Sequence, residues 1–164
     1  MRHFSSRFGI VLVAGVFITG CGLITGNDDE PNDSGNYTTA TLTHDGFDFS
    51  ANAEGWSEAY DGETIGWQPG AADNPAYPRD VNLWWRPSTG ATKDMGAVSM
   101  ASVTQAPTTW DTSPNIPALL VGHVVVARCA DGSVKFRVIS VDVNGAMWPV
   151  QVEFYYSATA TFDH

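Results

Sequence analysis

The sequence predicts an all-β fold, an antiparallel β-sandwich or open barrel with long Trp- and Pro-rich loops, after an N-terminal signal peptide. Three observations carry this prediction. Apolar and polar residues alternate with a period of two in several stretches after residue 36, which is the period of a half-buried strand. An Asp-Gly turn separates two β-branched runs near the C-terminus. Beyond the first twenty residues, no stretch carries the apolar stripe of an amphipathic helix.

Residues 1–20 have the pattern of a lipoprotein signal peptide. Arg2 and Arg7 supply a positive start, and an apolar run at residues 8–18 follows them. That run is shorter than the roughly 20 apolar residues that span a bilayer. Residues 18–21 then read Ile-Thr-Gly-Cys. This resembles the lipobox of bacterial lipoproteins, where the chain is cut before the cysteine and the thiol is joined to a diacylglycerol.

The lipobox resemblance implies that Cys21 is the lipid anchor. Such proteins usually carry several acyl chains, which is enough for stable attachment to a membrane. Gly22 follows the cysteine, whereas an Asp at that place commonly marks inner-membrane retention in proteobacteria. We therefore expect a lipid-anchored protein of the bacterial cell envelope, with the outer membrane favoured.

Residues 21–36 are expected to be the lipidated cysteine and an acidic, flexible tether. They are rich in Gly, Asp, Asn and Pro and almost free of bulky apolar side chains after Ile24. Their four acidic residues lack the order of ligands and glycine found in calcium loops. A single β domain is then expected over residues 37–164.

The charge balance excludes one class of partner. The 164 residues contain 8 Lys and Arg against 18 Asp and Glu, for a net charge of −10. Removal of residues 1–20 would take away two arginines and no acid, which moves the net charge to −12. Nucleic acid is excluded as a partner because phosphate binding needs a basic stripe. The same acidic balance gives the protein no attraction to an anionic membrane surface. We therefore expect the lipid, and not charge, to attach the protein to a membrane.

Only two cysteines occur, Cys21 and Cys129, which excludes a disulfide framework and a thiolate zinc site of the usual spacing. With Cys21 joined to lipid, Cys129 has no partner for a disulfide in its own chain. We expect its side chain to be buried on the inner face of a hairpin as a small hydrophobe.

The strands are expected in order along the chain. A short β-branched strand is expected at residues 38–43, and alternating strands at 46–50 and 80–84. A hairpin joins residues 122–129 to 133–140, and Gly132 is expected to supply the positive φ of its turn.

In the last strand, one face is expected to carry Val150, Val152, Phe154 and Tyr156. Trp84 and Trp85 should point to opposite faces of their strand, with one in the core and the other exposed or covered by a loop. Residues 51–79 and 87–121 resist strand assignment, and loops of that length are usually functional.

Four segments after the lipobox carry a family resemblance. They are a Phe-x-Phe strand at 47–50, an Asp-Val-x-Leu strand at 80–83, a Ser-Thr-Gly stretch at 88–96, and a closing hairpin and strand at 124–138 and 152–156. Their order resembles the HmuY-like family of haem-binding bacterial lipoproteins. The resemblance implies an all-β lipoprotein that binds haem or a related ligand, commonly for iron acquisition, with an outer-membrane receptor as a partner.

Haem iron takes axial ligands such as His, Met, Cys or Tyr, and the ring needs an apolar slot. The family resemblance implies paired His or Met ligands. Ordinary roles remain open for each candidate: a hydrogen-bonded histidine, a turn residue, or a methionine that fills a gap in the core. The candidate haem ligands are His123, His44, Met100 and Met147, with Met95 beside them.

Large aromatic side chains could stack on a porphyrin or on the face of a sugar, although most tryptophans in sheet proteins fill the core. The candidate ligand-binding residues of this kind are Trp67, Trp85 and Trp110.

No G-x-S-x-G, H-E-x-x-H, P-loop or C-x-x-C motif occurs, so we do not expect an enzyme. Three functions stay open. The first is a lipid-anchored haem binder, and the second is a non-haem binding or adhesion module for a glycan or a partner protein. The third is a structural envelope lipoprotein without a small ligand.

Overall fold

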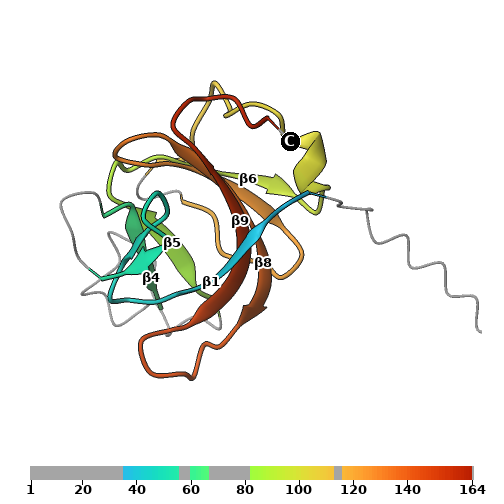
Figure 1. The fold of residues 1–164 in the computed structure, drawn as a ribbon. Helices are drawn as coiled ribbons and strands as arrows, with labels where there is room; N and C mark the ends of the chain where they lie inside the picture. The colour runs from blue at the N-terminus through green and yellow to red at the C-terminus, as the bar shows by residue number, and fades with distance from the viewer. Residues whose placement is uncertain (1–34, 56–59, 67–81, 113–115, 164) are drawn as a thin grey trace, which may run out of the picture.

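The computed structural model describes residues 35–55, 60–66, 82–112 and 116–163. Within them, two antiparallel sheets pack face to face, and the one short helix is the 3-10 helix η1 (Met100–Ser102) (Figure 1). The predicted all-β sandwich is confirmed, and the sheets do not close into a barrel. None of the described helical residues forms a segment long and apolar enough to cross a membrane.

Each sheet follows a simple antiparallel order. The larger sheet has the order β1-β9-β8-β7-β6 and the smaller one the order β3-β2-β4-β5. The strands of the larger sheet are β1 (Thr38–Leu42), β6 (Thr92–Gly96), β7 (Val124–Arg128), β8 (Ser133–Val141) and β9 (Val150–Ser157). Those of the smaller sheet are β2 (Phe47–Asp48), β3 (Ala53–Glu54), β4 (Gly62–Ile65) and β5 (Trp84–Pro87).

The main core lies between the two sheets and is built on aromatic rings. Phe49 stacks on Phe136 with ring centroids 5.8 Å apart, and it also contacts Trp85 and Phe154. The predicted inner face of the last strand is confirmed, because Val150, Val152, Phe154 and Tyr156 belong to this core or pack against it. Large aromatic side chains of this kind supply much of the apolar burial that holds two sheets together.

A second cluster covers part of the outer face of the larger sheet. Met100 of η1 and Phe162 near the C-terminus pack on Val124 and Val126 of β7. Backbone hydrogen bonds fix these covering segments to each other: Ala106 N donates to Ala160 O at 2.7 Å, and Phe162 N donates to Thr104 O at 2.8 Å. The sandwich is therefore sealed on this side by chain that has little regular structure.

The predicted hairpin forms, but its glycine has a different role. Cys129 N donates to Gly132 O at 3.0 Å, so Ala130 and Asp131 form the tip of the turn. Gly132 is not among the glycines with positive φ. A Cβ there would lie 2.3 Å from the carbonyl oxygen of Ser157, so close approach of the neighbouring chain requires glycine at this position.

Strand content was under-predicted in the two stretches expected to be loops. Residues 51–79 contain β3 and β4, and residues 87–121 contain β6. β4 reads Gly-Glu-Thr-Ile and is buried throughout, so it lacks the alternation of a half-buried strand. β6 carries Lys93 and Asp94 and is only partly buried.

The strand expected at residues 80–84 starts later, since β5 begins at Trp84; residues 80 and 81 lie outside the described part. The prediction for Trp84 and Trp85 is confirmed. Trp85 lies in the main core, whereas Trp84 packs with Ile65 under Ile116 and Ala118 of a covering loop.

Candidate functional site

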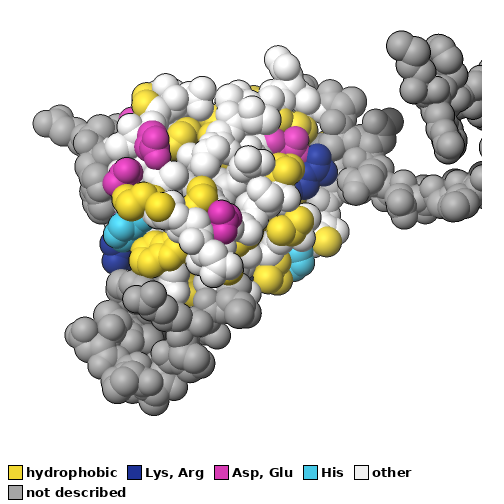
Figure 2. Space-filling view, turned by 90° about the horizontal axis from the view of Figure 1, so that it is seen from below, with side chains coloured by type: hydrophobic (Ala, Val, Ile, Leu, Met, Phe, Trp, Pro, Cys, Tyr) yellow, Lys and Arg dark blue, Asp and Glu magenta, His cyan; other side chains and the backbone are white. Residues whose placement is uncertain are grey.

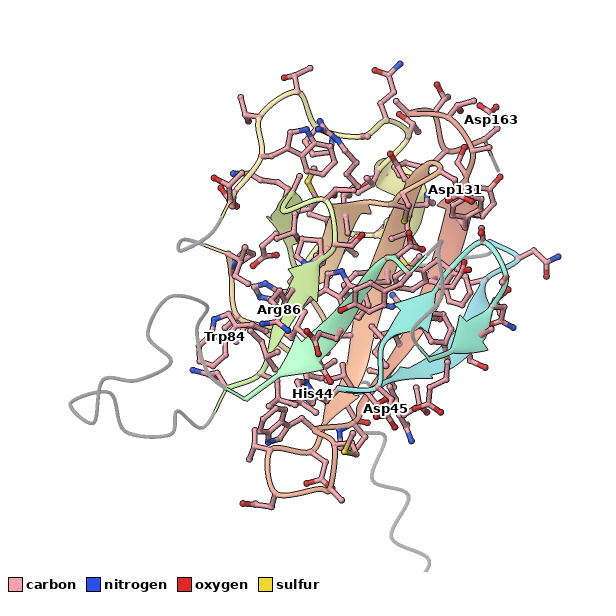
Figure 3. All side chains as sticks on the ribbon, turned by 90° about the vertical axis from the view of Figure 1, so that its left-hand side faces the viewer. His44, Asp45, Trp84, Arg86, Asp131 and Asp163 are labelled. Carbon is pink, nitrogen blue, oxygen red and sulfur yellow. The ribbon has the colours of Figure 1, made fainter. Side chains whose placement is uncertain are left out.

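Three segments meet at the end of the sandwich opposite the β7–β8 turn. The turn after β1 joins β4, because Thr64 N donates to Thr43 O at 2.9 Å. The same turn joins the β8–β9 connection, because His44 N donates to Met147 O at 2.8 Å. In Figure 3, His44 lies toward the lower end of the molecule, Asp131 of the hairpin turn toward the upper end, and Arg86 between them. We call this meeting point, with His44, Glu63, Arg86, Met147 and Trp148, the His44 corner.

A buried carboxylate lies at the base of the His44 corner. Glu63 on β4 is fully buried. Its Oε2 lies 2.8 Å from His44 Nδ1, and its Oε1 forms an ion pair with Arg86. No well-aligned hydrogen bond reaches either oxygen within the described residues, so the pairing is chiefly electrostatic. The side chains of His44 and Arg86 are each 39% exposed. One buried charge therefore holds two partly exposed groups in place.

The surroundings of His44 fix which ring nitrogen carries the proton. Nδ1 lies 3.1 Å from the carbonyl oxygen of Thr64 as well as close to Glu63. Both neighbours are acceptors, so the proton of the neutral ring resides on Nδ1. Nε2 then keeps its lone pair, and no described residue hydrogen bonds to it. Histidines that ligate metals usually donate their other ring N–H to a carboxylate or a backbone carbonyl, and here the Thr64 carbonyl can accept it.

Met147 and Trp148 complete the corner in an unusual backbone conformation. Their φ angles are 65° and 52°, in the left-handed region that bulky residues rarely adopt. The Trp148 ring meets the His44 ring edge-on with centroids 5.1 Å apart, and its carbonyl accepts a 2.7 Å hydrogen bond from Thr64 Oγ1. The Met147 side chain is 41% exposed. Left-handed residues of this type cluster at binding sites, where the surroundings hold them in place.

A glycine makes room for the Trp148 ring. A Cβ on Gly66 would lie 2.6 Å from the indole. The turn after β4 therefore fixes the position of Trp148, and through it the position of His44.

The other candidate haem ligands lie elsewhere. His123 Nδ1 is 2.9 Å from Asp94 of edge strand β6, so this histidine is held at the far side of the sheet from β1. The two histidine patches in Figure 2 lie toward opposite sides of the face shown there. Met100 of η1 is fully buried, and Met95 packs on the same outer cluster. Of the candidate ligands, the structure brings together only His44 and Met147.

The candidate aromatic residues also separate. Trp85 is 1% exposed and belongs to the core, so it fills space between the sheets. Trp110 is partly exposed and lies against Arg128, whose guanidinium carbon is 4.9 Å from the ring centroid. Trp67 and Cys21 lie outside the described residues.

Cys129 is buried on the inner face of its hairpin, as predicted. Burial raises the pKa of its thiol, and the nearby Asp61 carboxylate raises it further. Asp61 is itself buried and accepts hydrogen bonds from Phe49 N at 2.8 Å and Ala130 N at 3.0 Å. A thiol that stays protonated is a poor nucleophile and a poor metal ligand, so this cluster joins the two sheets and offers no reactive group.

No group of three or more His, Cys, Asp or Glu side chains in the described part of the chain could hold a metal ion. Comparison with protein families, with curated proteins and with solved structures gave no match for this chain.

Sequence reasoning missed Glu63 and Trp148. Glu63 sits in a four-residue strand that shows no alternation, and its burial depends on partners from β1 and β5 that only the fold supplies. The Met-Trp-Pro sequence at 147–149, between two predicted strands, was the available signal for Trp148.

Proposed function

We propose that this protein is a lipid-anchored ligand-binding protein of the bacterial cell envelope that binds haem at the His44 corner. The observation that carries the proposal is the state of His44. Its Nδ1 faces two acceptors, its side chain is 39% exposed, and no described residue hydrogen bonds to its Nε2, whose lone pair can then bind a metal. Met147, which is 41% exposed, joins His44 in the same corner through a backbone hydrogen bond.

The two donors of the His44 corner are of kinds that haem iron takes. Imidazole nitrogen and thioether sulfur are both axial ligands of haem iron. His44 would supply the nitrogen ligand, and Glu63 would orient it and raise its basicity. Arg86 places a guanidinium at the same buried carboxylate, where it can attract the propionates of the ligand. Bound haem would supply the iron, which is the cargo in an iron-acquisition role.

The lipobox and the tether support the envelope part of the proposal. A chain with 18 acidic and 8 basic residues gains little from an anionic membrane surface, so the anchor has to be the lipid on Cys21. Labelling with a radioactive fatty acid tests this directly. Wild type should incorporate label and Cys21→Ser should not, and equal labelling of both would contradict it.

Titration with haemin tests the ligand. The chain from residue 21 onward, carrying Cys21→Ser, is titrated while the Soret absorbance is followed. We expect a saturable shift at micromolar haemin, which His44→Ala abolishes and Met147→Leu alters in position. His123→Ala is the matched control and should leave the titration unchanged. Absence of a saturable shift in the unsubstituted protein ends the haem proposal.

One observation favours the second function, a binding module for acidic glycans. Arg128 is exposed and lies over Trp110, and no described carboxylate pairs with it. A guanidinium beside an aromatic ring can bind the carboxylate and the face of an acidic sugar. A glycan array would show binding that Trp110→Ala removes and that haemin does not compete with.

A further inference from the structure

The sandwich protects its sheet edges in three of four places. On β6, Thr92 and Asp111 exchange backbone hydrogen bonds of 3.2 and 2.7 Å. On β5, Leu119 N donates to Leu83 O at 2.7 Å, and Ala118 bridges to Trp84. β3 is only two residues long. Natural sheets cover or shorten their edges in this way because unpaired strands invite pairing with other chains.

β1 is the exception. It pairs with β9 from Thr38 to Leu42, and the two strands lie side by side in Figure 1. On its other side, no described residue pairs with these five. Every second residue of β1 therefore directs its N–H and C=O groups away from the sheet. The strand reads Thr-Thr-Ala-Thr-Leu, with no charge, no proline and no bulge in its pairing.

The residues of β9 that neighbour β1 carry no net charge. Gln151 and Glu153 neighbour it on β9, and Glu153 is neutralised by an ion pair with Arg137. An open groove of about 500 Å³ lies across β1, β9 and β8, and Ile139 within it is 45% exposed. The groove is lined by Thr39, Ala40, Thr41, Ile139, Gln151 and Val152. In a chain with a net charge of −10, the β1 strands themselves thus add no charge repulsion to a contact between two copies.

We propose that two copies of this chain pair through β1 in an antiparallel arrangement, which joins their larger sheets into one. The strand is self-complementary about Ala40. A two-fold axis there places Thr39 opposite Thr41 of the second copy, and Thr41 opposite Thr39 of the second copy. Threonine pairs across antiparallel strands are favourable, and a two-fold contact closes without leading to filaments.

The position of β1 in the chain supports a second copy of this chain as the partner that pairs with its free edge. β1 begins at Thr38, directly after the segment expected to be the tether. Two copies anchored in one leaflet would hold their β1 strands in the same thin layer beside the membrane, which raises their local concentration above that in solution. A short strand pair that is weak in solution becomes favourable under those conditions. The pairing does not depend on haem binding.

Sedimentation velocity tests the pairing, with the chain from residue 21 carrying Cys21→Ser and examined over a range of concentrations up to the highest at which it stays soluble. We expect a reversible dimer. Thr39→Lys with Thr41→Lys places like charges opposite each other and should give a monomer, as should Thr39→Glu with Thr41→Glu. An equimolar mixture of the two variants should restore the dimer, because each lysine then faces a glutamate.

Thr108→Lys with Thr109→Lys is the matched control, since it changes the charge equally at exposed threonines of a loop. It should dimerise like the unsubstituted protein. A monomer at every concentration overturns the proposal. So does a dimer that the Thr39 and Thr41 variants leave intact, because that dimer would use another surface.

Discussion

Two regions of this molecule each bury a charged side chain completely, and they do so in opposite ways. Lys135 on β8 donates to the carbonyl oxygens of Met100 at 2.7 Å and Val103 at 2.9 Å. Its ammonium also lies 5.2 Å from the ring centroid of Phe162 and 5.5 Å from that of Tyr155. All of these partners belong to the segments that seal the outer face or to the sheet itself.

Glu63 is buried to the same extent, but its partners His44 and Arg86 are each 39% exposed. The charge of Lys135 thus interacts only with groups inside the protein, whereas the charge of Glu63 interacts with two side chains that reach the surface. A buried charge whose partners are also buried serves stability. One whose partners reach solvent is a stronger sign of a binding site.

Replacement of Lys135 by methionine should have the largest effect on stability. The variant keeps the aliphatic stem but removes the ammonium. The Val103 carbonyl then loses its donor, whereas the Met100 carbonyl keeps a 3.2 Å hydrogen bond from Val103 N. An unsatisfied buried group costs about 1–3 kcal/mol, so we expect the free energy of unfolding to fall by about 2 kcal/mol in urea denaturation. Lys93→Met is the control, because Lys93 pairs with Asp111 at the surface and should cost less than about 1 kcal/mol. Equal losses in both variants would contradict the comparison.

Replacement of Glu63 by glutamine should act on binding instead. His44 would lose the charge that orients its ring and raises the basicity of Nε2, and changes of this kind cost roughly 10- to 100-fold in metal affinity. We expect haemin affinity to fall by that factor in the Soret titration. Glu153→Gln removes the other glutamate that pairs with an arginine, Arg137, and should leave the titration unchanged.

The main core and the Glu63 site also differ in how far the sequence could predict them. The main core follows from local pattern, because the alternation of β9 and the hairpin at residues 122–140 specify which side chains face inward. The role of Glu63 does not follow from local pattern. Its partners come from residues 44 and 86, and only the fold places them together.

Lys135 shows the same limit within a correctly predicted strand. Lys135 is fully buried, and its ammonium contacts Met100 and Val103 of the η1 region and Phe162 of the C-terminal segment. The segments that cover Lys135 show no periodic pattern of apolar residues, so its burial could not be predicted from the sequence. The candidate ligands were likewise named by residue type, and their separation into His44 with Met147 and His123 with Asp94 required the strand order.

Asp61 offers a third kind of buried charge, one with no cation beside it. Burial raises the pKa of its carboxyl above 3.8, and hydrogen bonds from Phe49 and Ala130 offset part of that rise. Because the pKa in the folded state is raised, its contribution to stability is full below pH 3.8 and is lost as the pH rises through the folded pKa. We expect the free energy of unfolding of wild type, relative to Asp61→Asn, to decrease from about pH 3 to pH 7. Chemical denaturation across this range measures it, with exposed Asp131→Asn as control; an increasing difference would contradict the expected direction.

Met147→Gly should have the smallest effect on stability and the opposite sign. Met147 is 41% exposed and has a φ of 65°, so a glycine at this position loses little packing. Glycine also removes the strain of the left-handed conformation, which is about 1 kcal/mol or more. Against this stands the conformational entropy that glycine loses on folding, which costs about 0.5–1 kcal/mol. We expect the free energy of unfolding to rise by about 0.5 kcal/mol while haemin binding weakens, since the thioether is lost. Val121→Gly is the control at a residue that is 62% exposed and not among those with positive φ, and it should lower stability by about 0.5–1 kcal/mol. A loss of stability in both variants would show that the conformation of Met147 stores no strain, and would remove the strain argument for the His44 corner.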